Sequence, residues 1–313
     1  MYKIKVGISA CLLGAPVRYD GGHKRSPFCE RELAEFFEYH PVCPEMAIGL
    51  GTPRPTIRLV KRQGEVRAEA SNGSFDVTDQ LIAFSEQKVR ELDFISGYIL
   101  CAKSPSCGME RVKVYGGAQG AAKEGVGLFA QALMQAHPLL PVEEEGRLND
   151  PILRENFVTR VFAYHDWQVL SQSPLTAARL IAFHSRYKYL VLAHAPKAYR
   201  ALGNLLGSLK GRDLAEVAEE YISGLMQALT LRANRKGHTN VLQHLQGYFK
   251  RQLSTGQREE LAEVIHKYRV GLLPLLVPLT LIRHYLRQFP NPYLAQQVYL
   301  EPHPETLKLR YSL

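Results

Sequence analysis

The spacing of apolar residues changes near residue 150, and this change limits the fold class more than any other feature of the chain. Across residues 1–140, short apolar runs alternate with amphipathic stretches. This alternation predicts an α/β domain, a Rossmann-like sheet flanked by helices. Beyond residue 150, apolar residues recur at helical spacing, as over 214–229. The second half is therefore predicted to be an all-α helical bundle.

Individual elements follow from the same patterns. Strands are predicted at 3–9, 40–43 and 94–101, a hairpin over 56–70 with its turn near Gln63-Gly64, an amphipathic stretch at 27–40, and helices at 78–92 and 121–136. The segment 141–150 combines a proline, an acidic run and Gly146 and is predicted to be a linker. The predicted domains are therefore 1–140 and 151–313.

Charge is divided unequally between the two halves. Residues 1–150 hold 18 Lys and Arg against 19 Asp and Glu, whereas residues 151–313 hold 21 against 11. All of the excess positive charge thus lies in the second half. A basic domain of this kind favours a polyanionic partner, most simply a nucleic acid, over a basic surface with no partner.

All five cysteines lie in the first 107 residues. An odd number, with no secretion signal at the start of the sequence, argues for reduced thiols in a cytoplasmic protein. The most apolar later stretch, 271–282, is too short to span a bilayer, so no membrane association is expected.

Three of the cysteines follow predicted strands. Cys11 follows the first strand, Cys43 the second, and Cys107 lies in the loop after 94–101. Because ligands bind beyond the carboxyl ends of strands in open α/β sheets, these thiols are predicted to meet at one point. Three thiolates suit either a zinc ion completed by His23 or His40, or an iron–sulfur cluster with one open iron.

The other two cysteines, Cys29 and Cys101, lie in apolar surroundings and are predicted to be buried structural thiols. Polar residues accompany the first three. Glu45 follows Cys43 by two positions and could move protons, and Ser104 and Ser106 precede Cys107 and could orient a substrate. Three further side chains could hold a nucleotide or could be ordinary turn residues: Arg18, Asp20 and Arg54.

These motifs carry a family resemblance. The runs SACLLG, VRYDG, VCPEMAIGLGTPRP and KSPSCG resemble the thiouracil desulfidase family of cluster-dependent enzymes. FHSRYKYLVLAHAPKAYRALG and NVLQHLQGYFKRQL resemble the YbgA-type helical domain. A chain that joins the two is similar to bacterial tRNA 4-thiouridine desulfidases, and the resemblance covers nearly the whole sequence.

The resemblance implies a [4Fe–4S] cluster held by Cys11, Cys43 and Cys107, with Glu45 as catalytic acid or base. It also implies a catalytic serine, for which Ser104 is favoured over Ser106. Many relatives carry one more cysteine before the Tyr-Asp-Gly motif, where this chain has Val17. The implied reaction is hydrolytic and redox-neutral: the open iron binds the thiocarbonyl sulfur, water replaces it, and hydrogen sulfide is released.

A tRNA partner would explain the positive charge of the second half, because Lys and Arg side chains bind phosphates. The predicted contacts are Arg179, Arg186, Lys188, Lys197, Arg200, Arg232, Arg235 and Lys236, with Lys210, Arg212 and His238 beside them. Arg232 and Arg235 could instead cap a helix. His184 and His194 are predicted to be core histidines with satisfied hydrogen bonds.

Other functions remain compatible with the residues. The nearest is a desulfidase of free thiolated bases or nucleotides, which would make little use of residues 151–313. A non-enzymatic metal or redox sensor that binds nucleic acid would leave Glu45 and the serines without a role. A cluster-dependent hydro-lyase would leave the basic domain without one.

Overall fold

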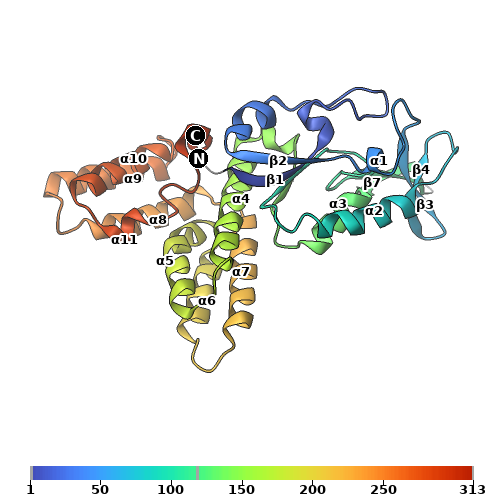
Figure 1. Ribbon diagram of the computed structural model, residues 1–313. Helices are drawn as coiled ribbons and strands as arrows, with labels where there is room; N and C mark the ends of the chain where they lie inside the picture. Colours follow the sequence, from blue (N-terminus) through green and yellow to red (C-terminus); the bar gives the residue numbers. More distant parts are fainter. Residues whose placement is uncertain (1–2, 118–119, 312–313) are drawn as a thin grey trace. The chain divides into compact units, whose positions relative to one another are not determined.

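The computed structural model describes residues 3–117 and 120–311 and divides into two compact units, Met1–Asp150 and Pro151–Leu313 (Figure 1). The first unit is α/β with parallel strand pairing, and the second is helical throughout the part of it that is described. The predicted fold class is confirmed.

The first unit is built around an all-parallel sheet with the order β2–β1–β5–β8. Its strands are β2 (Phe37–Val42), β1 (Ile4–Ser9), β5 (Tyr98–Leu100) and β8 (Val142–Glu144). Val6 and Ile8 of β1 and all of β5 are buried, as expected for a parallel sheet covered on both faces. Since all four strands run the same way, the segments that follow them gather at one edge.

A second, mixed sheet has the order β4–β3–β6–β7. Its strands are β4 (Glu65–Ala70), β3 (Ile57–Arg62), β6 (Val112–Gly117) and β7 (Gly120–Gly125). The predicted hairpin corresponds to β3 and β4, which pair from Ile57↔Ala70 to Arg62↔Glu65. Gln63 and Gly64 form its two-residue turn, both with positive φ as a type I′ turn requires.

In the described part of the first unit, three α-helices and four other helical turns accompany the sheets. They are η1 (Ala10–Leu13), η2 (Phe28–Glu32), η3 (Leu33–Glu35), α1 (Pro44–Ala47), α2 (Thr78–Arg90), α3 (Leu128–Ala136) and η4 (Arg147–Asn149). Helices α2 and α3 lie side by side (Figure 1). Asp76 accepts a hydrogen bond from the backbone N–H of Thr78 and so stabilises the start of α2.

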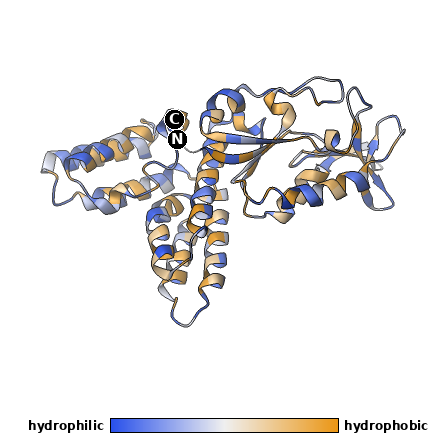
Figure 2. Ribbon diagram, in the orientation of Figure 1, coloured by the Kyte–Doolittle hydropathy of each residue, from blue (hydrophilic) through white to orange (hydrophobic). Residues whose placement is uncertain are grey.

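The second unit consists of helices joined by short connections. They are α4 (Pro151–Ser171), α5 (Ala177–His194), α6 (Pro196–Gly207), α7 (Leu214–Thr230), α8 (Arg235–Tyr248), α9 (Thr255–Arg269), α10 (Leu276–Gln288) and α11 (Pro292–Ala295), followed by the turns η5 (Glu305–Leu307) and η6 (Leu309–Tyr311). Hydrophobic and hydrophilic residues interleave along these helices (Figure 2), as amphipathic helices require. None of the helices in the described ranges is both long enough and apolar enough to cross a membrane.

Some predicted elements were wrong. The supposed linker 141–150 belongs to the first unit, because Val142–Glu144 pair with β5 and Glu143 forms an ion pair with Arg147. The helix predicted over 121–136 begins only at Leu128. Residues 120–125 instead form β7, because pairing with β6 outweighs the weak helical preference of a glycine-rich segment. In 27–40 the helical turns end by Glu35, and β2 starts at Phe37.

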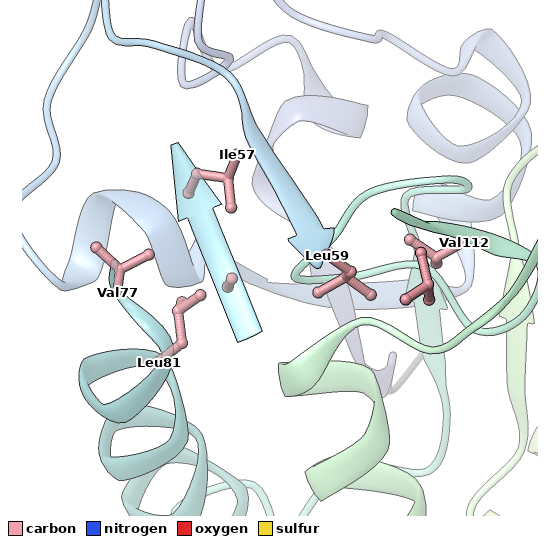
Figure 3. Packing of buried hydrophobic residues seen from close by; sticks show 7 residues of the cluster. Ile57, Leu59, Val77, Leu81 and Val112 are labelled. Atoms are coloured by element: carbon pink, nitrogen blue, oxygen red, sulfur yellow. The ribbon is translucent and has the colours of Figure 1, made fainter. Parts of the chain in front are cut away.

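The core of the second sheet predicts that alanine substitutions at two adjacent residues of α2 lower the free energy of unfolding by very different amounts. Leu81 packs with Ile57, Leu59 and Val77 (Figure 3). Its side chain is 0% exposed, whereas that of Ile82 is 41% exposed. Leu81→Ala should lower the free energy of unfolding by about 3 kcal/mol, because it removes buried methyl groups and leaves a cavity. Ile82→Ala should change it by less than about 1 kcal/mol. Urea unfolding followed by far-UV circular dichroism measures both, and equal losses would contradict this packing.

Candidate active site

A cavity of about 540 Å³ opens where the strands of the parallel sheet end. Four cysteines line it: Cys11 after β1, Cys43 after β2, and Cys101 and Cys107 after β5. Three strands that are far apart in sequence therefore bring their thiols to one place. The remaining cysteine, Cys29, is buried and lies outside the cavity, in agreement with the structural role predicted for it.

The thiols of this cavity are close enough to influence one another. Cys11 and Cys101 share a hydrogen bond, which together with burial raises the pKa of Cys11 and itself lowers the pKa of Cys101. Burial raises the pKa of Cys43 and of Cys107. Within residues 3–117 and 120–311, no three Cys, His, Asp or Glu side chains surround a single point closely enough to hold one metal ion.

The position of Cys101 in the cavity was not predicted from the sequence. Its place at the end of an apolar run indicated a core residue, and the side chain is indeed 4% exposed. It nevertheless lines the cavity and contacts Cys11. The available signal was its position directly after the last residue of β5, the same relation that Cys43 has to β2.

Glu45 lies at the start of α1 and is held on both of its carboxylate oxygens. The Oε2 atom accepts hydrogen bonds from Arg54 Nη2 at 2.6 Å and Nε at 3.1 Å, so two N–H groups of this ion pair converge on one oxygen. The Oε1 atom accepts one from Ser106 Oγ at 2.9 Å. This carboxylate faces the thiol cavity in one fixed orientation, as proton transfer requires.

Arg54, predicted to contact substrate, lines the thiol cavity, and its guanidinium is hydrogen-bonded within the protein. Besides Glu45, its guanidinium donates to the carbonyl oxygens of Gly51 and Val17 and to the sulfur of Met46. These bonds occupy every N–H group of the side chain, which is almost fully buried. Arg54 therefore positions Glu45 and ties it to two neighbouring loops.

The two serines of the Ser-Pro-Ser-Cys loop have different surroundings. Ser104 lines the cavity, and its Oγ accepts hydrogen bonds from the backbone N–H groups of Ser106 and Cys107 at 3.2 and 3.1 Å. Ser106 is 0% exposed and donates its hydroxyl to Glu45. A substrate in the cavity would thus meet Ser104, while Ser106 acts on the carboxylate.

Consecutive carboxylates from the end of β8 hold both ends of this loop. Glu145 accepts a hydrogen bond from the backbone N–H of Ala102 at 2.7 Å, and Glu144 accepts one from that of Met109 at 2.9 Å. Glu145 also forms an ion pair with Lys24, a cavity residue. Sequence reasoning missed this role because it assigned the acidic run to a linker.

Helix α3 packs directly on the same loop. The backbone N–H groups of Leu128 and Phe129 donate to the carbonyl oxygens of Pro105 and Ser106. This approach depends on Gly127, because a Cβ atom there would lie 2.5 Å from the carbonyl carbon of Ser106. The loop that carries Ser104 and Cys107 is therefore held from three sides, by β8, α3 and α1.

Of the other predicted site residues of the first unit, some line the thiol cavity and others lie outside it. Arg18 and His23 line the thiol cavity. Asp20 is exposed and outside it, and its Oδ1 accepts a hydrogen bond from the backbone of Gly22, as in an ordinary turn. His40 also lies outside the cavity, with its ring 4.7 Å from that of Phe94.

The basic residues predicted to contact tRNA also fall into two groups. Four of them have intramolecular partners. Arg179 donates to the carbonyl oxygen of Leu170 at the end of α4, and Arg186 forms an ion pair with Asp166. Lys188 lies over the Tyr293 ring, and Arg235 donates to the carbonyl oxygen of Tyr268 at the end of α9. Arg235 thus has the capping role considered as its alternative. Exposed members with no ion pair among the described residues are Lys197, Arg200, Arg232 and Lys236.

The two histidines expected in the helical core have hydrogen-bond partners. His184 Nδ1 lies 3.3 Å from Tyr221 Oη, and His194 Nδ1 lies 2.6 Å from Leu231 O. Burial lowers the pKa of both to about 4, so they are neutral at physiological pH. The interpretation as satisfied core histidines is confirmed.

The burial of each thiol predicts the sequence in which the cysteines react with an alkylating agent in metal-free protein. Cys43 is partly exposed and the other four cysteines are buried, so iodoacetamide should alkylate Cys43 first and Cys29 among the last. Because burial raises the pKa of Cys43, the rate should keep rising above pH ~8.5, where an ordinary thiol levels off. Peptide mapping by mass spectrometry at several pH values measures this. A plateau below pH ~8.5, or early loss of Cys29, would contradict it.

Comparison with known proteins gives a separate result for each half. Residues 6–145 match the family described as 2-thiouracil desulfurase, and residues 188–304 match a protein family of unknown function, DUF1722. The solved structure of TudS, a [4Fe–4S]-dependent thiouracil desulfidase, has 34% sequence identity, covers 47% of this chain and 95% of its own, and gives a TM-score of 0.38.

Among curated proteins, the uncharacterized protein YbgA of Escherichia coli (strain K12) is 37% identical over 159 residues. The match spans 50% of this chain and 94% of YbgA. The chain therefore belongs to the family of YbgA, and it combines an N-terminal domain of the 2-thiouracil desulfurase type with a C-terminal DUF1722 domain.

Proposed function

We propose that this protein is a desulfidase that converts 4-thiouridine in tRNA to uridine and releases hydrogen sulfide. The reaction exchanges a thiocarbonyl sulfur for the oxygen of water, so no electron donor or acceptor is needed. The observation that carries the proposal is a single cavity in which cysteines from three strand ends face a fixed glutamate. The match of residues 6–145 to the 2-thiouracil desulfurase family supports it.

The proposed cofactor is a [4Fe–4S] cluster held by Cys11, Cys43 and Cys107. The donor set fits such a group, since each cysteine of a cluster binds a different iron and so need not crowd around one point. The raised pKa of each of these three thiols means that metal must displace its proton, so loading should release protons. When bound, the cluster would supply an iron without a cysteine ligand, a Lewis acid for thiocarbonyl sulfur.

The side chains around the cavity can perform the remaining steps. Glu45 can accept a proton from the water that attacks C4 of the thiouracil ring and return it to the departing sulfur. Arg54 and Ser106 keep its two oxygens in place, so little reorganisation is needed during the reaction. The Ser104 hydroxyl lines the cavity, where it can hydrogen-bond to the ring. The cavity volume of about 540 Å³ lies within the range of small-molecule sites.

A tRNA substrate is favoured by the charge of the second half. Residues 151–313 carry 21 Lys and Arg against 11 Asp and Glu, an excess that a free base would not require. Lys197, Arg200, Arg232 and Lys236 are exposed and unpaired among the described residues, so they are available to phosphates. A thiouridine buried in folded tRNA must also turn out of its stack to enter the cavity.

The first test uses anaerobically reconstituted protein and tRNA that contains 4-thiouridine. Wild type should convert 4-thiouridine to uridine, measured by nucleoside analysis after digestion. Cys107→Ala should lose both iron and activity, and Glu45→Gln should keep its iron but lose at least about 100-fold in rate. Cys29→Ala is the matched control, because this thiol lies outside the cavity, and it should keep both.

The results separate the possible functions. Unchanged tRNA with an intact cluster and turnover of free thiouracil compounds would replace the proposal with a small-molecule desulfidase. A protein that loads iron but acts on neither substrate would be a binding or sensing protein. Full iron content in Cys107→Ala would overturn the ligand assignment.

Charge reversal in the second unit tests the choice of tRNA. The triple variant Lys197→Glu, Arg200→Glu and Lys236→Glu should lower kcat/KM for tRNA by at least about tenfold, because it replaces phosphate-attracting charges by repelling ones. Turnover of the free 4-thiouridine nucleoside should stay within about twofold. Equal losses on both substrates, measured at one salt concentration, would show that these residues do not act through tRNA.

A further inference from the structure

A second cavity, of about 780 Å³, adjoins the thiol cavity in the first unit. The two share Ile57, Ala102, Lys103 and Pro105 as lining residues. Residues of β3, β6 and β7 in the mixed sheet line one part of the second cavity, and the segments 102–111 and 144–147 line the rest. It contains none of the cysteines or other residues to which the proposed reaction assigns a chemical step.

Half of the charged residues that line this second cavity are cations without an ion-pair partner among the described residues. Arg111 pairs with Glu110, and Arg147 pairs with Glu110 and Glu143. In contrast, no carboxylate of the described residues lies within 4 Å of the cationic groups of Arg58, Lys103, Lys113 or Lys123. Four unpaired cations in one concave site create a positive potential that favours an anionic ligand.

Two of these cations stand directly opposite each other. Lys113 of β6 and Lys123 of β7 are cross-strand partners in the antiparallel ladder. Like charges at such positions destabilise a sheet, because the side chains of directly opposed residues are close together. Both side chains are exposed, and an anion placed between them would remove this repulsion.

Beside the lysines, an arginine and a tyrosine side chain line the cavity. The guanidinium of Arg58 lies 5.4 Å from the centre of the Tyr115 ring. The Arg58 Nε atom is inaccessible to solvent and has no hydrogen-bond partner. A buried donor without an acceptor is unfavourable, and an anionic ligand beside this guanidinium would offset part of that cost. Arginine and tyrosine side chains are also the usual surfaces on which unpaired RNA bases stack.

We propose that this second cavity binds the RNA strand next to the thiouridine. A phosphate of the neighbouring nucleotide would lie between Lys113 and Lys123, and the adjoining base would lie against Tyr115 and Arg58. Lys103 lines both cavities, so the strand can pass from one to the other over this residue. The inference rests on the proposed function, in that it assigns to the catalytic unit itself a share in substrate binding.

The test compares three substrates of increasing phosphate content. They are the 4-thiouridine nucleoside, its 5′-monophosphate and a trinucleotide with 4-thiouridine at its centre. The variant Lys113→Ala/Lys123→Ala removes both opposed charges at exposed positions. Lys61→Ala is the matched control, because Lys61 is an exposed lysine of β3 that lines neither cavity.

The double variant should raise KM for the trinucleotide about tenfold with little change in kcat. Its turnover of the nucleoside should not change. The dependence of log(kcat/KM) on log[salt] should become shallower by about 0.7, since the double variant removes one phosphate contact and each such contact with a single strand contributes about 0.7. The Lys61→Ala variant should behave like wild type in all three measurements.

A binding measurement makes the test independent of turnover. The dissociation constant of a fluorescent uridine trinucleotide, measured by fluorescence polarisation with the full chain, should rise about tenfold in the double variant. Unchanged affinity, or an effect confined to the 5′-monophosphate, would overturn the strand site. Wild type that binds and desulfurises the trinucleotide but ignores tRNA would refute the proposed tRNA function while leaving this inference intact.

Discussion

The parallel pairing of β2, β1, β5 and β8 is the constraint on which the rest of the site depends. It places the four segments after these strands at one edge, so that residues as distant as Cys11 and Cys107 line the same cavity. Each strand end contributes thiol, hydroxyl or carboxylate side chains. Cys11 follows β1, Cys43 and Glu45 follow β2, the Ser-Pro-Ser-Cys loop follows β5, and Glu145 follows β8.

Charges taken out of water at this edge are stabilised by partners that also fix the geometry. Arg54 uses every N–H group to hold Glu45 and the loops beside it. Burial raises the pKa of Glu144, and its hydrogen bond with the Met109 backbone opposes that shift. Such groups are unfavourable to bury without partners, so their positions are strongly determined by the surrounding loops. The result is a site in which Glu45, Glu144 and Glu145 are each held by hydrogen bonds from the surrounding loops.

Residue patterns are enough to predict part of this arrangement. The fold class and the three strand-end cysteines follow from periodicity and from the rule for ligand positions in open sheets. The function of β8 does not follow, because Pro141 and three glutamates have the composition of a linker, and only pairing with β5 makes them a strand. The role of Arg54 cannot be predicted either, because the sequence does not show whether an arginine is exposed or is buried with five hydrogen bonds.

The net charge of the first half likewise does not predict where charge lies on the folded surface. The first half has 18 basic and 19 acidic residues, which by itself suggests no affinity for RNA. The fold separates these charges: ion pairs neutralise Arg54, Arg62, Arg67 and Arg147, while Lys113 and Lys123 remain unpaired on adjacent strands. An electrostatic surface depends on which charges remain uncompensated, and strand pairing decides this. A nearly neutral catalytic unit can therefore hold a local basic cavity beside its active site.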